Sequence, residues 1–571
     1  MQKKWQIAKK ITQEFIDKFP EINPVILQLL YSRGITEQEK IDEFLNPDYE
    51  KLHSPFLFSD IKKTIARIKK TISKNEKIFV YGDYDADGVT SSALLISCLK
   101  KIGADCDIYI PHRENEGYGL NNEAIKTISG KDAKLIITVD CGISDFQEVE
   151  FAKDLGIEII ITDHHAPPKK LPKCLILNPQ ADKNYPFKEL AGVGVAFKLS
   201  QALLKEFAEE KKFSAVVFEK WLLDLVAIGT IADCVPLLGE NRIITKYGLI
   251  VLNKTKRAGL KTLIKKATIN KDTLDSYNIS FQLSPRINAA GRMNHANAAY
   301  KLLVSKSLEK AENLADELNK TNSDRQKLTD RITNEVISEI GDNPDKKAVI
   351  LLKNECLIGI LGLIAGKITS LYNRPSLILT EKNNKIVGSG RSIPKFNIIE
   401  ALENLKDLFS NFGGHSQACG FTLKDKKIFP EFQKRFLELI NEKLQNKDLL
   451  PIINIAAEIK LSQITWQVFD ELNKFRPFGQ ANQQPIFLTR NLKVLSSKEV
   501  GQNGNHLKIF VNSHNEQVAR NLDCIGFGIA KNWRGNLKAG NFIDLAYNID
   551  ENRWNGNREL QLKVVDLRII N

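Results

Sequence analysis

The sequence predicts an α/β protein of several domains: a parallel-sheet domain, a second α/β domain and a C-terminal β-barrel. Three observations lead to this prediction. Strand-like apolar runs alternate with helix-like stretches over residues 75–235, an order typical of a mostly parallel sheet with right-handed crossovers. The same alternation returns over residues 345–447. From residue 450 onward, apolar and polar residues alternate in short runs between turn signals, which is typical of barrels such as the OB-fold.

The chain has 571 residues, enough for three or four domains at roughly 150 residues each. Its apolar content of 43% is ordinary for a globular protein with ample core. We predict five segments: a helical arm (1–72), a first α/β domain (73–240), a helical connector (241–344), a second α/β domain (345–448) and a barrel (449–571).

The helical arm is predicted from the spacing of its apolar residues. Ile11, Phe15 and Phe19 recur at helical intervals, and Asn46-Pro47 interrupts the pattern. No chemistry is visible in this segment, so we expect a packing or substrate-guiding role.

The first α/β domain carries an acidic cluster at the end of its first predicted strand. The apolar run 77–81 is followed by Asp83, Asp85 and Asp87, and Gly88 then opens a helix-like stretch. Ligands of open α/β sheets bind at the carboxyl ends of strands. Carboxylates this close repel one another unless cations neutralise them, and oxygen ligands suit Mg²⁺ or Mn²⁺. A solvated acidic turn is the alternative.

Two further predicted strands, 134–140 and 157–162, also end in polar residues. The first delivers Asp140, the second delivers Asp163-His164-His165, and a helix-like run over 222–231 ends at Asp233. Shorter strands are expected at 106–110 and 174–178. Repeated Asp and His residues after apolar runs predict one shared two-metal site, and the histidine favours manganese.

The middle of the chain has two motifs that allow opposite interpretations. The glycine-rich run 190–196 fits tight helix packing better than a phosphate loop. The stretch 284–293 is predicted to be irregular, with Arg286 and Arg292 flanking small residues. It is either an exposed basic loop or a phosphate contact. The charge-dense run 308–340 is expected to be one long connecting helix.

The second α/β domain has strand-like runs at 348–352 and 376–379 and two glycine-rich stretches. We predict loops with exposed amides at 388–392 and 411–416. His415, in the second of these loops, is either a structural histidine or a substrate contact.

The barrel segment alternates basic and aromatic residues between predicted turns at 501–504 and 555–557. A basic groove with aromatic platforms suits single-stranded nucleic acid, although these aromatic residues could equally be core. The residues concerned are Lys508, Arg534, Lys538, Arg553, Phe510, Trp533 and Trp554.

Charge and cysteine usage narrow the class of protein. The net charge of +13 favours a polyanionic partner, although a genome rich in A and T also raises the lysine content. None of the eight cysteines forms a Cys-x-x-Cys pair, which argues against a zinc knuckle and fits a reducing cytosol. No signal peptide or membrane-spanning run is expected, so we predict a cytoplasmic protein without a membrane partner.

These motifs together resemble those of the DHH phosphoesterase superfamily, and within it the RecJ exonucleases. The resemblance rests on Asp-Tyr-Asp-Ala-Asp-Gly (83–88), Val-Asp-Cys-Gly (139–142), Thr-Asp-His-His (162–165) and Ala-Asp-Cys-Val-Pro (232–236), and it extends to 284–293, 411–416 and Phe475–Gln480. It implies catalytic roles for Asp83, Asp85, Asp140, His164, His165 and Asp233. The metal ligands are expected among Asp83, Asp85, Asp87, Asp140, His164 and Asp233, with Asp163 orienting a histidine.

The metal set departs from many DHH hydrolases, which place a histidine just before the first aspartate. Phe79, Val80 and Tyr81 occupy that region here, so Asp87 is the least defined ligand. The resemblance also implies substrate-binding residues beyond the metals. They are Arg286, Asn288, Arg292, Ser389, Arg391, Gly413, Gly414 and His415.

The function that the resemblance implies is a 5′→3′ exonuclease specific for single-stranded DNA, acting in repair and recombination with two Mn²⁺ or Mg²⁺ ions. The expected partners are single-stranded DNA, a single-strand-binding protein and a helicase, and the expected state is a monomer. Two alternatives stay open: an oligoribonuclease or cyclic-dinucleotide phosphodiesterase of the same superfamily, and a non-catalytic replication scaffold.

Overall fold

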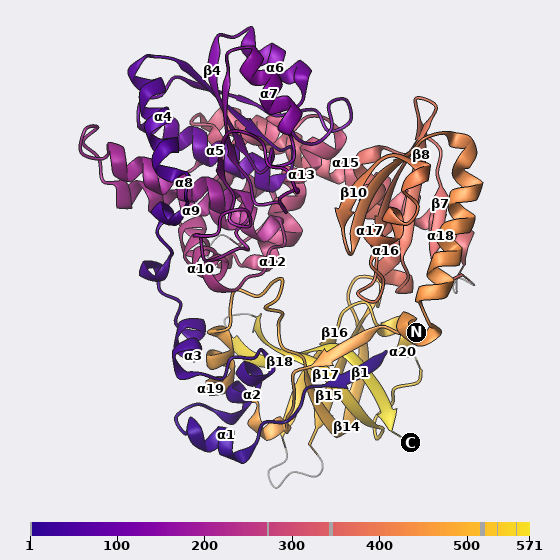
Figure 1. Cartoon of the computed structure of the whole chain (residues 1–571). Helices are drawn as coiled ribbons and strands as arrows, with labels where there is room; N and C mark the ends of the chain where they lie inside the picture. Colours follow the sequence, from indigo (N-terminus) through magenta and orange to yellow (C-terminus); the bar gives the residue numbers. More distant parts are fainter. Residues whose placement is uncertain are drawn as a thin grey trace. The chain divides into compact units, whose positions relative to one another are not determined.

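In this computed structural model the chain forms two compact units, and the elements are labelled in Figure 1. One unit contains residues 49–450 and 479–481, and the other contains residues 1–48, 451–478 and 482–571. The structure describes residues 3–270, 273–341, 346–513, 520–533, 535–554 and 557–570, without the side chains of residues 553, 554 and 557. The five segment boundaries stay predictions.

The first α/β domain is built on a five-stranded parallel sheet in the order β3-β2-β4-β5-β6. All five predicted strands are present: β2 (Lys77–Gly82), β3 (Cys106–Tyr109), β4 (Ala133–Val139), β5 (Glu158–Thr162) and β6 (Leu175–Leu177). Side chains alternate across a strand, so Ile78 and Val80 face one side while Phe79 and Tyr81 face the other.

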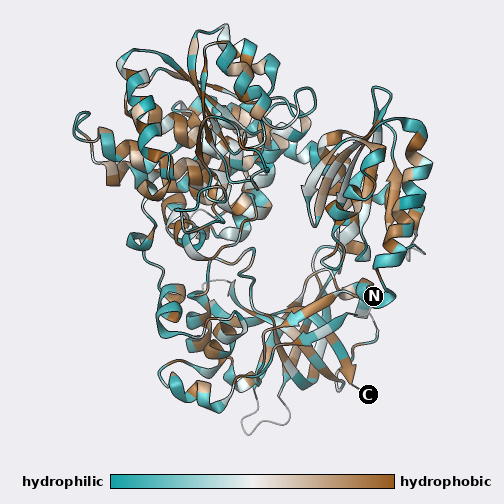
Figure 2. Ribbon diagram, in the orientation of Figure 1, coloured by the Kyte–Doolittle hydropathy of each residue, from teal (hydrophilic) through white to brown (hydrophobic). Residues whose placement is uncertain are grey.

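Helices cover both faces of this sheet. The side with Ile78 and Val80 packs against α5 (Ala86–Lys101) and α8 (Gly192–Phe207), and α9 (Ala215–Ala232) packs against these two helices. The side with Phe79 and Tyr81 packs against α6 (Asn122–Ser129) and α7 (Phe146–Asp154). Both layers bury apolar area, which Figure 2 shows as brown strands between helices of mixed colour. The carboxyl ends of the strands are therefore a rigid place for functional side chains.

Further helices complete this part of the chain. They are α4 (Ile61–Ser73), α10 (Gly239–Asn253), α11 (Ala258–Lys266), α12 (Ser276–Asn278), the π-helix η4 (Ile279–Leu283), α13 (Ser284–Met293) and α14 (Asn297–Val304). The prediction of an irregular stretch at 284–293 was wrong, because these residues form α13. Their small residues serve close packing: a Cβ at Gly291 would lie 2.5 Å from the carbonyl oxygen of Tyr84.

The long connecting helix was confirmed as α15 (Leu308–Ile340), which has 33 residues and is about 50 Å long. Its first half packs against α11, α13 and α14, and its second half against α16 (Ile358–Tyr372). It therefore joins the first α/β domain to the second within one unit (Figure 1).

The second α/β domain contains a mixed sheet in the order β10-β11-β9-β8-β7. Its elements are β7 (Val349–Leu352), β8 (Ser376–Lys382), β9 (Lys385–Arg391), β10 (Phe409–His415), β11 (Ala418–Leu423), α17 (Ile398–Glu403) and α18 (Phe429–Lys443). The loops predicted at 388–392 and 411–416 were wrong in large part. They lie mostly in β9 and β10, since pairing with β11 satisfies backbone groups of residues that have weak strand propensity.

The other unit contains the predicted barrel. β14 (Phe487–Val500), β15 (His506–Asn512), β16 (Asn521–Gly526), β18 (Asn557–Ile570) and β17 (Phe542–Trp554) pair in that order, and β14 pairs with β17 to close the ring. The turn at 501–504 is present, whereas Arg534 and residues 555–556 lie outside the described residues.

The N-terminal segment belongs to this second unit. Its helices α1 (Gln13–Lys18), α2 (Pro24–Ser32) and α3 (Gln38–Leu45) follow a short strand, β1 (Lys4–Ile7), which pairs in parallel with β12 (Ile452–Ile455). The Trp5 indole donates a hydrogen bond of 2.8 Å to Asp566, and the guanidinium of Arg568 lies 4.0 Å from the Trp5 ring centroid. The two ends of the chain therefore fold together.

Remaining short elements complete the description. β13 (Ala457–Glu458) pairs with β14, and α19 (Trp466–Asn473) and α20 (Ala530–Trp533) accompany the barrel. Among the described residues, no helix is both long and apolar enough to span a bilayer.

Candidate metal centre and its surroundings

The three acidic residues after β2 take different positions around the start of α5. Asp85 is the N-cap: its Oδ1 accepts hydrogen bonds from the backbone N–H groups of Asp87 (2.8 Å) and Gly88 (3.0 Å). Asp83 is buried, and its Oδ1 has no hydrogen-bond partner among the described residues. The Asp85 cap explains why an acidic run begins a helix here rather than forming a solvated turn.

Asp87 is held by the N-terminus of another helix. Its two carboxylate oxygens accept hydrogen bonds from the N–H groups of Gly192 (2.7 Å) and Val193 (2.9 Å), the first residues of α8. The amides of a helix N-terminus favour a negative charge. The glycine-rich run thus packs α8 against the acidic motif, as its packing interpretation predicted, and Asp87 is fixed on both oxygens by backbone.

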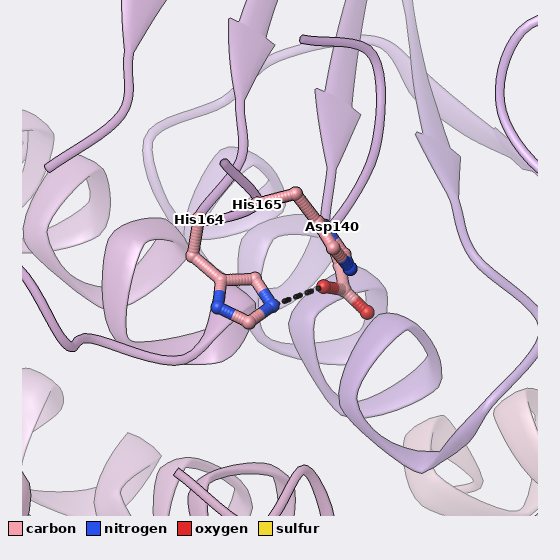
Figure 3. A group of neighbouring side chains, drawn as sticks. All are labelled: Asp140, His164 and His165. Atoms are coloured by element: carbon pink, nitrogen blue, oxygen red, sulfur yellow. Dashed lines mark ion pairs between the residues drawn. The ribbon is translucent and has the colours of Figure 1, made fainter. Parts of the chain in front are cut away.

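Asp140 lies directly after β4 with a φ of 62°, and its N–H donates to the Thr162 carbonyl at 3.0 Å. This backbone conformation is sparsely populated for a residue other than glycine, and it aims the carboxylate at His164. The distance between Asp140 Oδ1 and His164 Nε2 is 3.2 Å (Figure 3). Asp233, the C-cap of α9, lies 3.5 Å from the same nitrogen.

Asp163 organises the histidine pair. Its Oδ1 accepts hydrogen bonds from the backbone N–H groups of His164 (2.7 Å) and His165 (3.1 Å), and it lies 2.8 Å from His165 Nδ1. The Tyr118 hydroxyl is 3.0 Å from the same nitrogen and 3.2 Å from the carbonyl oxygen of Asp140. His165 is therefore oriented from two sides, with Nε2 turned away from these contacts.

The side chains from separate strand ends meet in overlapping groups. Within each group, one ligand atom per residue lies within 4.8 Å of the others: Asp83, Asp85 and Asp140; Asp140, His164 and His165; Asp87, His164 and Asp233. Asp140 and His164 each belong to two groups. The convergence that the sequence predicts is thus present in the geometry.

The acidic groups strongly disfavour sharing this space as bare anions. Burial and the charge of Asp85 raise the pKa of Asp83 to about 8, and the same two causes raise that of Asp87 to about 7. Burial and the charge of Asp87 raise the pKa values of Asp140 and Asp233 well above the usual range. Only protons or cations relieve this repulsion.

The histidines are tuned in opposite directions. Burial, followed by the charge of His165, lowers the pKa of His164 to about 4, so this imidazole is neutral at pH 7. Burial opposes the charged form of His165, but its hydrogen bond and ion pair with Asp163 raise its pKa overall. A neutral His164 can act as a metal ligand, and a more basic His165 can donate to an anion.

The residues fit a divalent metal centre. Asp83 Oδ1, Asp140 Oδ1 and His164 Nε2 are buried and lack hydrogen-bond partners among the described residues. Unsatisfied buried acceptors of this kind are costly unless something binds them. Carboxylates with one or two imidazoles form a donor set suited to Mn²⁺ or Mg²⁺.

The predicted substrate residues fall into two groups. Asn288 and Arg292 on α13 lie beside the centre: Asn288 accepts a hydrogen bond from Ala86 N–H at 2.8 Å, and Arg292 donates to the Gly359 carbonyl at 3.0 Å. Burial lowers the pKa of Arg292 to about 9. Arg286 instead donates hydrogen bonds to the Gln282 carbonyl and to Asn319 Oδ1.

The remaining predicted residues lie on the second sheet. Ser389 and Arg391 are on β9, and Arg391 donates to the Gly390 carbonyl at 2.9 Å. Gly413, Gly414 and His415 form the exposed edge strand β10. The charge of His415 contributes to lowering the pKa of His164, so this edge lies within electrostatic range of the centre.

Sequence reasoning missed Arg113 and Tyr118. The Arg113 guanidinium lies 3.9 Å from the Tyr84 ring centroid, its Nε is buried without a hydrogen-bond partner among the described residues, and its charge counteracts the raised pKa of Asp83. Both residues follow β3, and polar residues after a parallel strand are the same signal that identified Asp140.

Comparison with known proteins assigns the chain to a family. Three family models match: the DHH family N-terminal domain at residues 77–230, the DHHA1 domain at 327–446 and the RecJ OB domain at 455–566. The single-stranded-DNA-specific exonuclease RecJ of Bacillus subtilis is 37% identical over 99% of this chain and 71% of its own length. The chain belongs to the RecJ family.

Solved RecJ structures share the fold. The crystal structure of RecJ from Thermus thermophilus in complex with Mn²⁺ has a TM-score of 0.84 and 28% identity, covering 99% of this chain and 79% of that one. The structure of RecJ from this organism with Mg²⁺ has a TM-score of 0.78 and 26% identity, covering 99% and 78%. The predicted fold class, with a parallel-sheet DHH domain, a DHHA1 domain and an OB-like barrel, is confirmed.

Proposed function

We propose that this protein is a metal-dependent 5′→3′ exonuclease that hydrolyses single-stranded DNA in repair and recombination. The observation that supports this most is the meeting of buried, unsatisfied Asp83, Asp140 and His164 atoms at one centre, in a chain that belongs to a family of such exonucleases. A scaffold that had lost catalysis would not need this costly arrangement. A dinucleotide enzyme would not need the barrel that the RecJ OB model matches.

In the proposed mechanism Asp83, Asp85, Asp140, His164 and Asp233 would hold two Mn²⁺ or Mg²⁺ ions, and Asp140 would be the ligand common to both. The ions would activate water and neutralise charge on the phosphodiester. Asp87, whose oxygens accept backbone N–H groups, completes the site mainly by position. We propose two ions rather than one because two of the overlapping groups of side chains share Asp140.

The protein's own groups would bind and orient the phosphate. His165 presents Nε2 to a phosphate oxygen while Asp163 retains the proton on Nδ1, so the ring acts as a donor at one end only. Arg113 and Arg292 supply cationic forks near Asp83 and Asp85. Ser389, Arg391, Gly413, Gly414 and His415 are proposed to hold the 5′ end of the strand.

The test is the substitution Asp140→Ala with end-labelled oligonucleotides. We expect loss of Mn²⁺-dependent nucleotide release, a decrease of at least about 10³-fold, while single-strand binding is retained, because the carboxylate acts on the ions rather than on the bases. The unaltered protein should release the label of 5′-labelled single strands first and leave duplex intact. Cleavage by the Asp140→Ala variant would refute the metal assignment, and first release of a 3′ label would refute the direction.

A cytoplasmic location is proposed because all eight cysteines are free and most are buried. The single-strand-binding protein, helicase and monomeric state stay predictions.

A further inference from the structure

Two aromatic side chains stand exposed on the catalytic unit outside the metal centre. Tyr277 on α12 and Phe281 on η4 are 60% and 65% exposed, and their ring centroids are 4.7 Å apart with planes at 36°. Isolated exposed apolar residues are common, but a neighbouring pair of large rings keeps substantial apolar area in water. The two rings therefore form an exposed aromatic surface that a ligand can contact.

The backbone that carries the pair is a π-helical turn. η4 continues α12 and leads directly into α13. Ile279 and Leu283 are fully buried and anchor this turn to the core, while Tyr277 and Phe281 stand on the outer side. Single π-helical turns are rare and frequently occur at functional sites.

An arginine folds back over the same turn. Arg286 Nη1 donates a hydrogen bond of 2.7 Å to the carbonyl oxygen of Gln282, the residue after Phe281. Arg286 Nε donates at 3.0 Å to Asn319 Oδ1 on α15. Its hydrogen-bond partners among the described residues are thus a backbone carbonyl and an amide, which orient the guanidinium without neutralising it.

A second arginine continues this cationic surface along α15. Arg325 Nη2 donates at 2.5 Å to Asn322 Oδ1, and its Nε is buried without a hydrogen-bond partner among the described residues. The nearby Asp330 forms its ion pair with Lys367. The charge of Asp330 and, after it, that of Arg286 act on Arg325, so the two guanidiniums lie within electrostatic range of each other, and neither forms an ion pair with a carboxylate within the described chain.

We propose that Tyr277, Phe281, Arg286 and Arg325, here called the aromatic–arginine strip, form a second binding site for single-stranded nucleic acid. Bases stack on the two rings and successive phosphates bind the two guanidiniums, a combination that accepts any sequence. This inference rests on the proposed function, because it assigns the strip to the same substrate strand.

The strip lies one helix away from the metal centre. Arg286 is near the start of α13, and Arg292, whose pKa the charge of Asp85 acts to raise, is near its end. Six residues of helix rise about 9 Å. A strand whose scissile phosphate lies at the aspartates can therefore extend to the strip within a few nucleotides.

The first experiment measures binding without cleavage. Fluorescence anisotropy in EDTA gives the Kd of a 20-nucleotide single strand for the unaltered protein, the double variant Tyr277→Ala/Phe281→Ala, and Arg325→Ala. We expect the double variant to raise Kd roughly 10-fold or more. Arg325→Ala should raise Kd and reduce the slope of log Kd against log salt by about 0.7, the value for one lost phosphate contact to a single strand.

Matched controls separate the strip from general surface effects. Val216→Ala/Val217→Ala removes an apolar pair of similar exposure, 55% and 59%, at the start of α9. Arg331→Ala removes an arginine of the same helix, 69% exposed and paired with Glu335. Both should leave Kd within twofold. Tyr277→Leu/Phe281→Leu keeps apolar area but removes the rings, and it should behave like the alanine double variant.

Abasic substitutions locate the contact. A series of 20-nucleotide strands is prepared, each with one abasic site at a different position. An abasic site that raises the Kd of the unaltered protein should cause no further increase in Kd for the double variant. Mn²⁺-dependent hydrolysis of a 5′-phosphorylated dinucleotide, too short to reach the strip, should keep its kcat/KM in all these variants.

Three results would overturn the inference: unchanged Kd in the strip variants, equal weakening by the controls, or abasic effects that persist in the double variant. If the strip instead binds a protein partner, Kd for the single strand will be unchanged in the strip variants, which is the first of these results. If the unaltered protein binds the strand with the expected dependence on the strip but fails to cleave it with Mn²⁺, the proposed function fails while this inference stands.

Discussion

At the scale of single residues, the candidate metal centre is marked by buried atoms that lack hydrogen-bond partners among the described residues. Asp83 Oδ1, Asp140 Oδ1 and His164 Nε2 are buried from water and accept no protein hydrogen bond within the described chain. Asp140 also holds a left-handed backbone conformation at φ 62°. Unsatisfied buried polar atoms and a strained backbone both raise the free energy of the folded protein. Finding both at one site is typical of a binding site, where the bound ligand compensates for this free energy.

The first prediction concerns stability of the metal-free protein. The pKa values of Asp83 and Asp87 are raised to about 8 and 7, so the folded state binds more protons than the unfolded state between pH 4 and 8. Stability of the metal-free protein therefore decreases as pH rises through that window. Saturating Mn²⁺ should remove the decrease, adding about 2.7 kcal/mol at 100-fold excess over Kd. Thermal unfolding at pH 5.5, 7 and 8, with EDTA or MnCl₂, measures both effects.

The variant Asp140→Asn is the control for this prediction, because it removes one of the carboxylates that repel one another at the centre. Its metal-free form should lose less stability between pH 5.5 and 8 than the unaltered protein. A Tm shift with Mn²⁺ that is independent of pH would contradict the assignment of these carboxylates.

At the scale of elements, helix starts bring the acidic residues to the sheet edge. α5 begins after its N-cap Asp85, and α8 directs its first N–H groups at Asp87. α9 passes so close that Gly229 lies against side chains of both α5 and α8. Close approach needs glycine here: a Cβ at Gly229 would lie 2.6 Å from Asp87 Oδ1 and 2.5 Å from Thr90 Oγ1. The three helices thus behave as one packed support for the centre.

The second prediction is that Gly229→Ala impairs the site. The added methyl group must displace Asp87 or separate α9 from α5, and overpacking of this kind typically costs about 1–3 kcal/mol. We expect a lower Tm and weaker Mn²⁺-dependent hydrolysis, measured on the same preparation. Gly366→Ala is the matched control: it also lies inside a helix, its nearest atom would be 3.8 Å away, and alanine should be neutral or stabilising by up to about 1 kcal/mol.

If Gly229→Ala and Gly366→Ala have equal effects on activity, the packing of α9 against Asp87 does not matter for the centre.

At the scale of the whole molecule, the two ends of the chain belong together. β1 pairs with β12, Trp5 contacts Asp566, and Arg33 donates at 2.8 Å to the Gln483 carbonyl. Residues 49–450 form their own unit with its own cores. A boundary drawn at residue 72, as the spacing of apolar residues suggests, would cut through a helix, α4, that packs on the first sheet.

The third prediction compares two truncations. A chain of residues 49–450 should unfold cooperatively and hydrolyse a dinucleotide, since it contains the centre and both of its supporting sheets. A chain of residues 1–450 keeps the N-terminal segment without its barrel partners, so residues 1–48 should be cleaved early in limited proteolysis. Both chains should bind a long single strand more weakly than the full chain, measured by anisotropy. Protection of residues 1–48 in the longer truncation would contradict this assignment.

The sequence by itself determined the strands of the first sheet, the long helix α15 and the candidate residues of the metal centre. These are local signals: apolar runs specify buried strands, and polar residues directly after parallel strands share one edge. Such signals are sufficient to single out Asp83, Asp140 and His164.

Only the tertiary structure decided the rest. The stretch 284–293 is a helix that packs closely on both sides, with Gly291 against Tyr84 and Arg292 against Gly359 of α16, and 411–415 forms a strand because β11 supplies its hydrogen bonds. Arg113 and Tyr118 are placed by contacts with Tyr84 and His165, which belong to elements distant in sequence. A sequence pattern reports the periodicity of one segment. The features above depend instead on which other segment forms hydrogen bonds with the backbone of that segment and packs against its side chains.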